Sequence, residues 1–81
     1  MDVKVRFFAV LRETLGEGER MFRFPKDVAC EEVLAQLKNV FKDAASILEA
    51  SRLAVNGHFV SKNMRLAPGD EVEILPPVSG G

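Results

Sequence analysis

The stretch ACEEVLAQLKNVFK, residues 29–42, decides the fold, because the hydrophobic spacing of the chain changes there. Its apolar side chains fall on one stripe of an α-helix, and its charged side chains face away from that stripe. The stripe comprises Val33, Leu34, Leu37, Val40 and Phe41. The helix cap is weak, because Ala29 has no side-chain oxygen to accept a hydrogen bond from the first backbone amides. The best nearby residue with such an oxygen is Asp27. The flanking segments read as strands, so the helix must cover one face of a single sheet.

Two strands are expected before this helix. In residues 3–8 every second side chain faces the same way, with Val3, Val5 and Phe7 opposite Lys4, Arg6 and Phe8. A short helical turn is expected over residues 11–15, and a second strand over residues 20–24, which Pro25 ends. We expect the two strands to form a hairpin.

Three further strands are expected after the helix. Residues 44–50 read as another helical turn, and residues 53–55 and 59–60 flank Asn56-Gly57, which suits the positive φ angles of a type I′ hairpin. Pro68-Gly69-Asp70 reads as a turn, and residues 71–75 form the last strand, with Val72 and Ile74 inward. The first and last strands then lie side by side in mid-sheet. This is the α+β arrangement called the β-grasp, which we assign to residues 1–75, with an extended tail at 76–81.

Composition indicates one ordinary globular domain. The 81 residues are 47% hydrophobic and 28% charged, with a net charge of −1. Acidic and basic residues are interspersed, so neither nucleic acid nor an anionic membrane is an expected partner. The charges near Met1 exclude a signal peptide, no stretch has the length of a membrane span, and one cysteine forms no internal disulfide. We therefore expect a cytoplasmic protein.

The last residues, Pro76-Pro77-Val78-Ser79-Gly80-Gly81, carry the functional signal. Proline restricts its own φ and favours an extended conformation before it, so the segment is expected to leave the domain as a stiff stem of about 20 Å. Gly80 and Gly81 lack Cβ, so a narrow channel admits them and a reactant approaches the carboxylate of Gly81 closely. The alternative is an ordinary frayed chain end.

The chain offers no obvious catalytic group of its own. His58 is the only histidine, and it follows a turn, where a solvated loop residue is expected. Cys30 is the only cysteine, and we interpret it as a small, half-buried hydrophobic residue rather than a reactive thiol. Neither a metal-ligand cluster nor a phosphate-binding glycine loop is present in the sequence. We expect a carrier with no bound metal or cofactor, not an enzyme.

Five segments resemble one known family. They are Lys4-Val5-Arg6-Phe7-Phe8-Ala9, Leu11-Arg12-Glu13, Val55-Asn56-Gly57, Leu66-Ala67-Pro68-Gly69-Asp70-Glu71-Val72, and Leu75 through Gly81. Together they are similar to the small subunit of molybdopterin synthase, the MoaD-like sulfur carrier, and the resemblance covers essentially the whole chain.

The resemblance implies a mechanism. A ubiquitin-activating-like adenylyltransferase would use ATP to adenylate Gly81, and a persulfide sulfur would replace AMP to give a thiocarboxylate. The large synthase subunit, expected in a heterotetramer of two small and two large subunits, would accept the tail and hold the catalytic side chains. Sulfur would pass to cyclic pyranopterin monophosphate, to build the dithiolene that holds molybdenum or tungsten.

A surface for these partners is predicted from strand alternation. Phe8 and Leu75 are expected on the outer face of the sheet near the tail, and Phe59 is expected to extend that surface. On the same face Lys4 and Arg6 are expected to oppose Glu71 and Glu73 across the strands.

Three other functions remain open from the sequence. The first is a sulfur carrier of the thiamine pathway, which shares the fold and the glycine pair but usually lacks the Pro-Pro-Val stem. The second is a ubiquitin-like modifier conjugated to proteins through Gly81. The third is a β-grasp interaction module, which leaves the stem and the glycine pair unexplained.

Overall fold

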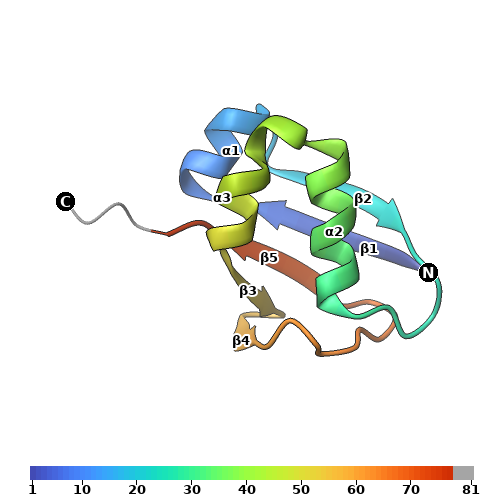
Figure 1. Cartoon of the computed structure of the whole chain (residues 1–81). Coiled ribbons are helices and arrows are strands. Elements are labelled where there is room, and N and C mark those ends of the chain that lie inside the picture. Colours follow the sequence, from blue (N-terminus) through green and yellow to red (C-terminus); the bar gives the residue numbers. More distant parts are fainter. Residues whose placement is uncertain (78–81) are drawn as a thin grey trace.

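Five strands form one mixed sheet in the order β2-β1-β5-β3-β4, and the helices cover one of its faces (Figure 1). This computed structural model describes residues 1–77. The elements are β1 (Asp2–Phe7), α1 (Ala9–Leu15), β2 (Glu19–Arg23), α2 (Cys30–Val40), the short 3-10 helix η1 (Lys42–Ala44), α3 (Ala45–Ala50), β3 (Arg52–Val55), β4 (His58–Val60) and β5 (Glu71–Leu75).

The central strands confirm the predicted β-grasp. β1 and β5 run parallel side by side, and the remaining neighbours, β1 with β2, β5 with β3 and β3 with β4, are antiparallel. The last strand therefore lies in the middle of the sheet, with a hydrogen-bonded neighbour on each side.

The core lies between the sheet and the helices. Strand alternation places Val5, Val72 and Ile74 inward, and each side chain is 0% exposed. From α2, the buried residues Val33, Leu34 and Leu37 complete the same cluster. These inward facings are as predicted.

The end of the helical stripe differs from the prediction. Val40 is 39% exposed and is the last residue of α2, because Phe41 leaves the helical conformation at φ −114° and ψ 68°. The half-buried ring of Phe41 packs edge-on against Phe7, with the ring centroids 5.8 Å apart. A regular helical period predicts that both Val40 and Phe41 contact the core. Because the helix ends at Val40, only Phe41 packs against the core cluster.

The start of α2 is capped by backbone and by its own glutamate. Ala29 occupies the N-cap position without a side-chain cap, and its amide donates to Glu32 Oε2 at 2.8 Å. The amides of Cys30 and Glu31 donate to carbonyl oxygens of the 61–65 loop at 2.9 and 2.7 Å. The weak cap was predicted. Asp27, the residue expected to supply the capping oxygen, has a left-handed backbone with φ 59°.

Two turns hold the start of β5 against the β3–β4 hairpin. Asn56 and Gly57 have φ values of 51° and 86°, as the predicted type I′ turn requires. The Asn56 side chain donates to Asp70 Oδ1 at 2.9 Å and accepts from the Glu71 amide at 3.0 Å. The Pro68-Gly69-Asp70 turn, closed by a 3.1 Å bond from the Asp70 amide to the Ala67 carbonyl, is thereby tied to the hairpin.

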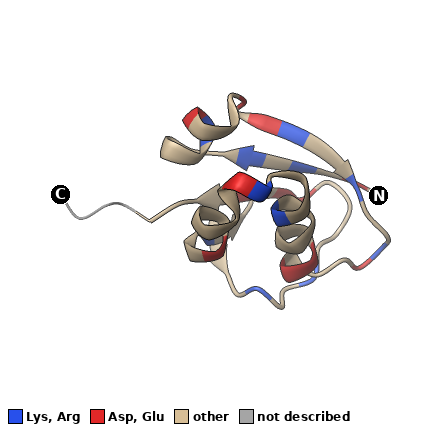
Figure 2. Cartoon of the chain, turned by 45° about the horizontal axis from the view of Figure 1, so that its top comes forward, with Lys and Arg blue, Asp and Glu red and all other residues tan. Residues whose placement is uncertain are grey.

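The charged pairs on the outer face are in the predicted register but make other contacts. Lys4 lies opposite Glu71 and Arg6 opposite Glu73. Within residues 1–77, however, Lys4 Nζ reaches Glu19 at 3.7 Å, and Glu73 Oε1 accepts the Gly57 amide at 2.7 Å. A long side chain on β1 can reach a residue on either neighbouring strand, so the register alone does not predict its ion-pair partner. Figure 2 shows both signs of charge interspersed over the molecule.

Candidate functional site

The predicted tail leaves the domain from its central strand. β5 ends at Leu75, which is half-buried like Pro76, and Pro77 is exposed. Because β5 pairs with both β1 and β3, the start of the stem is fixed on both sides. Val78, Ser79, Gly80 and Gly81, the remaining predicted tail residues, lie outside the described residues.

Phe8 and Leu75 share one end of the outer face. The parallel register ends with Phe7 opposite Ile74, and Phe8 and Leu75 are the next residues along the two segments. Both side chains are half-buried and neither belongs to the core cluster. The guanidinium of Arg6 lies 5.6 Å from the centroid of the Phe8 ring. Both side chains thus lie outside the core cluster, but neither is exposed as the sequence predicted.

Phe59 joins this end of the sheet through Arg52. Arg52 lies opposite Leu75 on β3, and its guanidinium carbon is 3.7 Å from the centroid of the Phe59 ring. Phe59 is 58% exposed. We call Phe8, Leu75, Arg52 and Phe59 the outer patch. Sequence reasoning missed Arg52, although the signal was available: Arg52 and Ala54 alternate with the inward residues Leu53 and Val55.

A strained residue sets the direction of the chain beside the outer patch. Ala9 has φ 53°, a left-handed conformation that is uncommon for a residue with a Cβ. It follows Phe8, which is extended at φ −125° and ψ 159°, and it begins α1. The strain allows the chain to turn into α1 directly after Phe8.

The two side chains considered from the sequence as catalytic candidates, Cys30 and His58, lie in unlike surroundings. Cys30 is buried, and burial, with a smaller contribution from the negative charge of Asp70, raises the pKa of its thiol, which opposes reactivity. His58 is exposed. Over residues 1–77 no cluster of three or more His, Cys, Asp or Glu side chains is arranged to hold a metal ion. In the same part of the chain no helix is long and apolar enough to cross a membrane.

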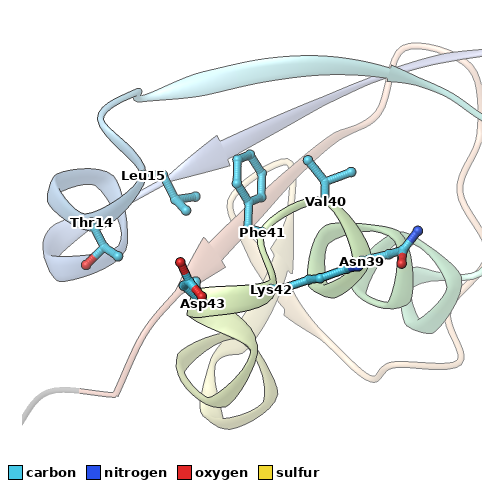
Figure 3. A pocket seen from close by; sticks show the side chains of 8 residues that line it. Thr14, Leu15, Asn39, Val40, Phe41, Lys42 and Asp43 are labelled. Atoms are coloured by element: carbon cyan, nitrogen blue, oxygen red, sulfur yellow. The ribbon is translucent and has the colours of Figure 1, made fainter.

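A cleft of about 570 Å³ opens on the helical side, and the sequence did not predict it. Figure 3 shows Leu15 of α1 and Phe41 at the end of α2 lining it from different elements, with Asp43 and Lys42 at its border. Its lining includes no histidine or cysteine. It offers a partly apolar surface, with the charged side chains of Lys42 and Asp43 in its lining.

Comparison with known proteins gives one family match and several relatives. Residues 5–81 match the model described as the ThiS family. The molybdopterin synthase sulfur carrier subunit of Escherichia coli is 39% identical, over 98% of this chain and 99% of the relative. The subunit of the same name from Chlamydomonas reinhardtii is 35% identical over the full length of both chains. Small archaeal modifier protein 3 of Haloferax volcanii is 29% identical, again over both full lengths.

Solved structures extend the comparison. Small archaeal modifier protein 1 from Methanosarcina acetivorans superposes with a TM-score of 0.82, at 26% identity, over 99% of this chain and 96% of that chain. A chain from the complex of subunits 1 and 2 of the molybdopterin-converting factor of Helicobacter pylori superposes with a TM-score of 0.64, at 28% identity, over the full length of both.

Proposed function

This chain belongs to the ThiS family and, within it, to the molybdopterin synthase sulfur carrier subunits; from that premise we propose that Gly81 carries the sulfur. The carboxylate of Gly81 is adenylated by a partner that uses ATP. The outer sulfur of a partner's persulfide then attacks the carbonyl carbon and displaces AMP, which gives an acyl disulfide. A partner thiol cleaves its S–S bond, forming a disulfide with the inner sulfur of the former persulfide and releasing a thiocarboxylate, which delivers sulfur to cyclic pyranopterin monophosphate.

The chemistry explains why activation is needed. A terminal carboxylate is ionised at neutral pH and is a poor electrophile. Joining it to AMP gives a mixed anhydride with a good leaving group, so a sulfur nucleophile can attack the carbonyl carbon. The lack of Cβ at Gly80 and Gly81 lets an enzyme enclose that carbon closely.

One observation carries the proposal: the strand that leads into the tail is the central strand of the sheet. β5 passes directly from its paired residue Leu75 to Pro76 and Pro77. A stem that begins from a paired central strand starts at a fixed point of the domain surface, and positioning is a large part of catalysis. The outer patch lies beside the start of the stem, so one partner can bind the patch and the tail at the same time.

We assign the reacting side chains of the transfer step to a large subunit, because burial raises the pKa of the Cys30 thiol and no metal-binding cluster lies within residues 1–77. The Helicobacter pylori relative, solved in a complex of subunits 1 and 2, supports a partner of that kind. We propose a heterotetramer of two small and two large subunits, and a separate ubiquitin-activating-like adenylyltransferase. Phe8, Leu75 and Phe59 are the proposed contacts to both partners.

Removing Gly81 tests the carrier function. The shortened chain still ends in a carboxylate, but its reactive carbon is withdrawn by about 3.5 Å, and misplacements of about 1 Å already impair catalysis severely. We expect thiocarboxylate formation to be lost, as measured by intact mass after incubation with the activating partner, ATP and a sulfur donor.

Two controls accompany the deletion. Adding one residue after Gly81 turns the native carboxylate into an amide, and we expect the same loss. Both variants should keep the wild-type circular dichroism spectrum and the wild-type affinity for the large subunit, since the outer patch is unchanged. A truncated chain that still accepts and delivers sulfur would remove the carrier proposal.

A second candidate function is protein modification through Gly81. The likeness to small archaeal modifier proteins from two organisms favours it, and its activation chemistry begins in the same way. It predicts an isopeptide bond between Gly81 and a lysine of another protein. Mass spectrometry of tryptic peptides for a lysine-linked remnant of the tail distinguishes it from sulfur transfer.

A further inference from the structure

One edge of the sheet is open. β2 is an outermost strand, and Figures 1 and 2 show it along the border of the sheet, with no described segment beyond it. Of its residues only Phe22 is half-buried, and the other four are exposed, including Met21 at 55%. An exposed edge presents unpaired backbone groups to any strand that can approach it.

The hydrogen bonds to β1 show which backbone groups face outward. The Phe24 amide donates to the Met1 carbonyl, and the Phe7 amide donates to the Gly18 carbonyl, both at 2.9 Å. In an antiparallel pair, hydrogen-bonded and non-bonded residue pairs alternate. Phe22 and Arg20 are therefore bonded to β1, and the backbone groups of Glu19, Met21 and Arg23 point to the open edge.

These three residues are complementary to themselves. When a second copy of β2 lies antiparallel with Met21 opposite Met21, Glu19 of each copy faces Arg23 of the other. These are also the residues with outward amides and carbonyls, so each facing pair can exchange both backbone hydrogen bonds. On the inward face, Arg20 comes opposite Phe22 of the other copy, a cation and an aromatic ring.

The two charged side chains are largely exposed, although each also contacts a residue of β1. The side chain of Arg23 is 82% exposed although it lies 3.1 Å from Asp2, and that of Glu19 is 56% exposed although it lies 3.7 Å from Lys4. Edge strands commonly carry charged side chains, which oppose pairing with a second copy. Here the signs are opposite and equally distant from Met21, so a two-fold axis through Met21 turns them into attractions.

We propose that a second copy of this chain pairs with the β2 edge, in an antiparallel register centred on Met21, to give a symmetric dimer with a continuous sheet. The opposite edge is less suited, because β4 has only three residues. β5 is separated from β2 by β1, so the dimer leaves the stem and the outer patch accessible. The proposal is independent of sulfur transfer, since it uses neither Gly81 nor the outer patch.

Sedimentation equilibrium of the full chain, up to millimolar concentration, tests the dimer with charge-reversal variants. Glu19→Arg alone and Arg23→Glu alone each place like charges opposite one another in both symmetric pairs. We expect each to raise the dimer dissociation constant by at least about tenfold. An equimolar mixture of the two variants restores both attractions, so we expect dimers to return in the mixture.

A second measurement does not depend on the variants. Amide chemical shifts of the wild-type chain, recorded over the same concentrations, should change at Glu19, Met21 and Arg23. Wild-type protein that stays monomeric at millimolar concentration would overturn the proposal. So would shifts confined to β4 or the outer patch, or a mixture of well-folded variants that stays as monomeric as its components.

Discussion

Replacing two neighbouring residues of β5 by alanine separates the core from the proposed docking surface. Ile74 is 0% exposed and belongs to the core cluster, whereas Leu75 faces the other way and is half-buried. We expect Ile74→Ala to destabilise the fold strongly and Leu75→Ala to weaken partner binding at little cost in stability.

The size of the difference follows from burial. Ile74→Ala removes three buried carbon atoms at about 0.8 kcal/mol each and leaves a cavity, so we expect a loss of about 3 to 4 kcal/mol. A domain of this size has a total stability of roughly 4 to 12 kcal/mol. That loss lowers Tm by about 12 to 30 °C. Leu75→Ala should cost about 1 kcal/mol or less, since its side chain keeps solvent contact in the folded state.

Urea denaturation followed by far-UV circular dichroism measures both variants, because the chain has no tryptophan or tyrosine for fluorescence. Calorimetric titration against the large subunit then gives affinity, and Leu75→Ala should bind at least about tenfold more weakly, equivalent to about 1.4 kcal/mol. Equal destabilisation by the two variants would refute the assigned facing of β5. Unchanged affinity of Leu75→Ala would remove Leu75 from the docking surface.

Two further predictions concern strain and turns. Ala9→Gly should raise the free energy of unfolding by about 0.5 kcal/mol, because relief of the left-handed conformation at φ 53° outweighs the added freedom of the unfolded chain; a less stable variant in urea denaturation would contradict this. Asp70→Ala should cost about 1 to 2 kcal/mol, because its two carboxylate oxygens accept from Asn56 Nδ2 and from the Ala67 amide at 2.9 and 2.8 Å. The exposed Asp43→Ala is the matched control for Asp70, and equal effects of the two would show that the turn network adds nothing.

Much of the fold could be predicted because local signals agreed. Alternation in residues 3–8 and 71–75 placed Val5, Val72 and Ile74 inward, and all three are fully buried. Asn56-Gly57 fixed the hairpin register, since few residue pairs tolerate two positive φ angles. Where the hydrophobic period, the turn residues and the chain length all indicate the same topology, one sequence is enough to predict the fold.

What could not be predicted depends on contacts between distant segments. The cap of α2 comes from carbonyl oxygens of the 61–65 loop, and the contact of Arg52 with Phe59 depends on the pairing of β3 with β4. The cleft bounded by Leu15 and Phe41 exists because α1 lies near the end of α2, which no local pattern encodes. The candidate tail was predicted from composition and stiffness, but its residues 78–81 lie outside the described part of the chain.

The intact mass of the protein isolated from its native cells tests the central claim most directly. If Gly81 carries sulfur, a fraction of the protein should be heavier than the unmodified chain by the difference between a sulfur and an oxygen atom. Fragmentation should place that difference on Gly81. A mass that shows only the unmodified chain under conditions of active cofactor synthesis, or only chains joined to other proteins through Gly81, would contradict the account.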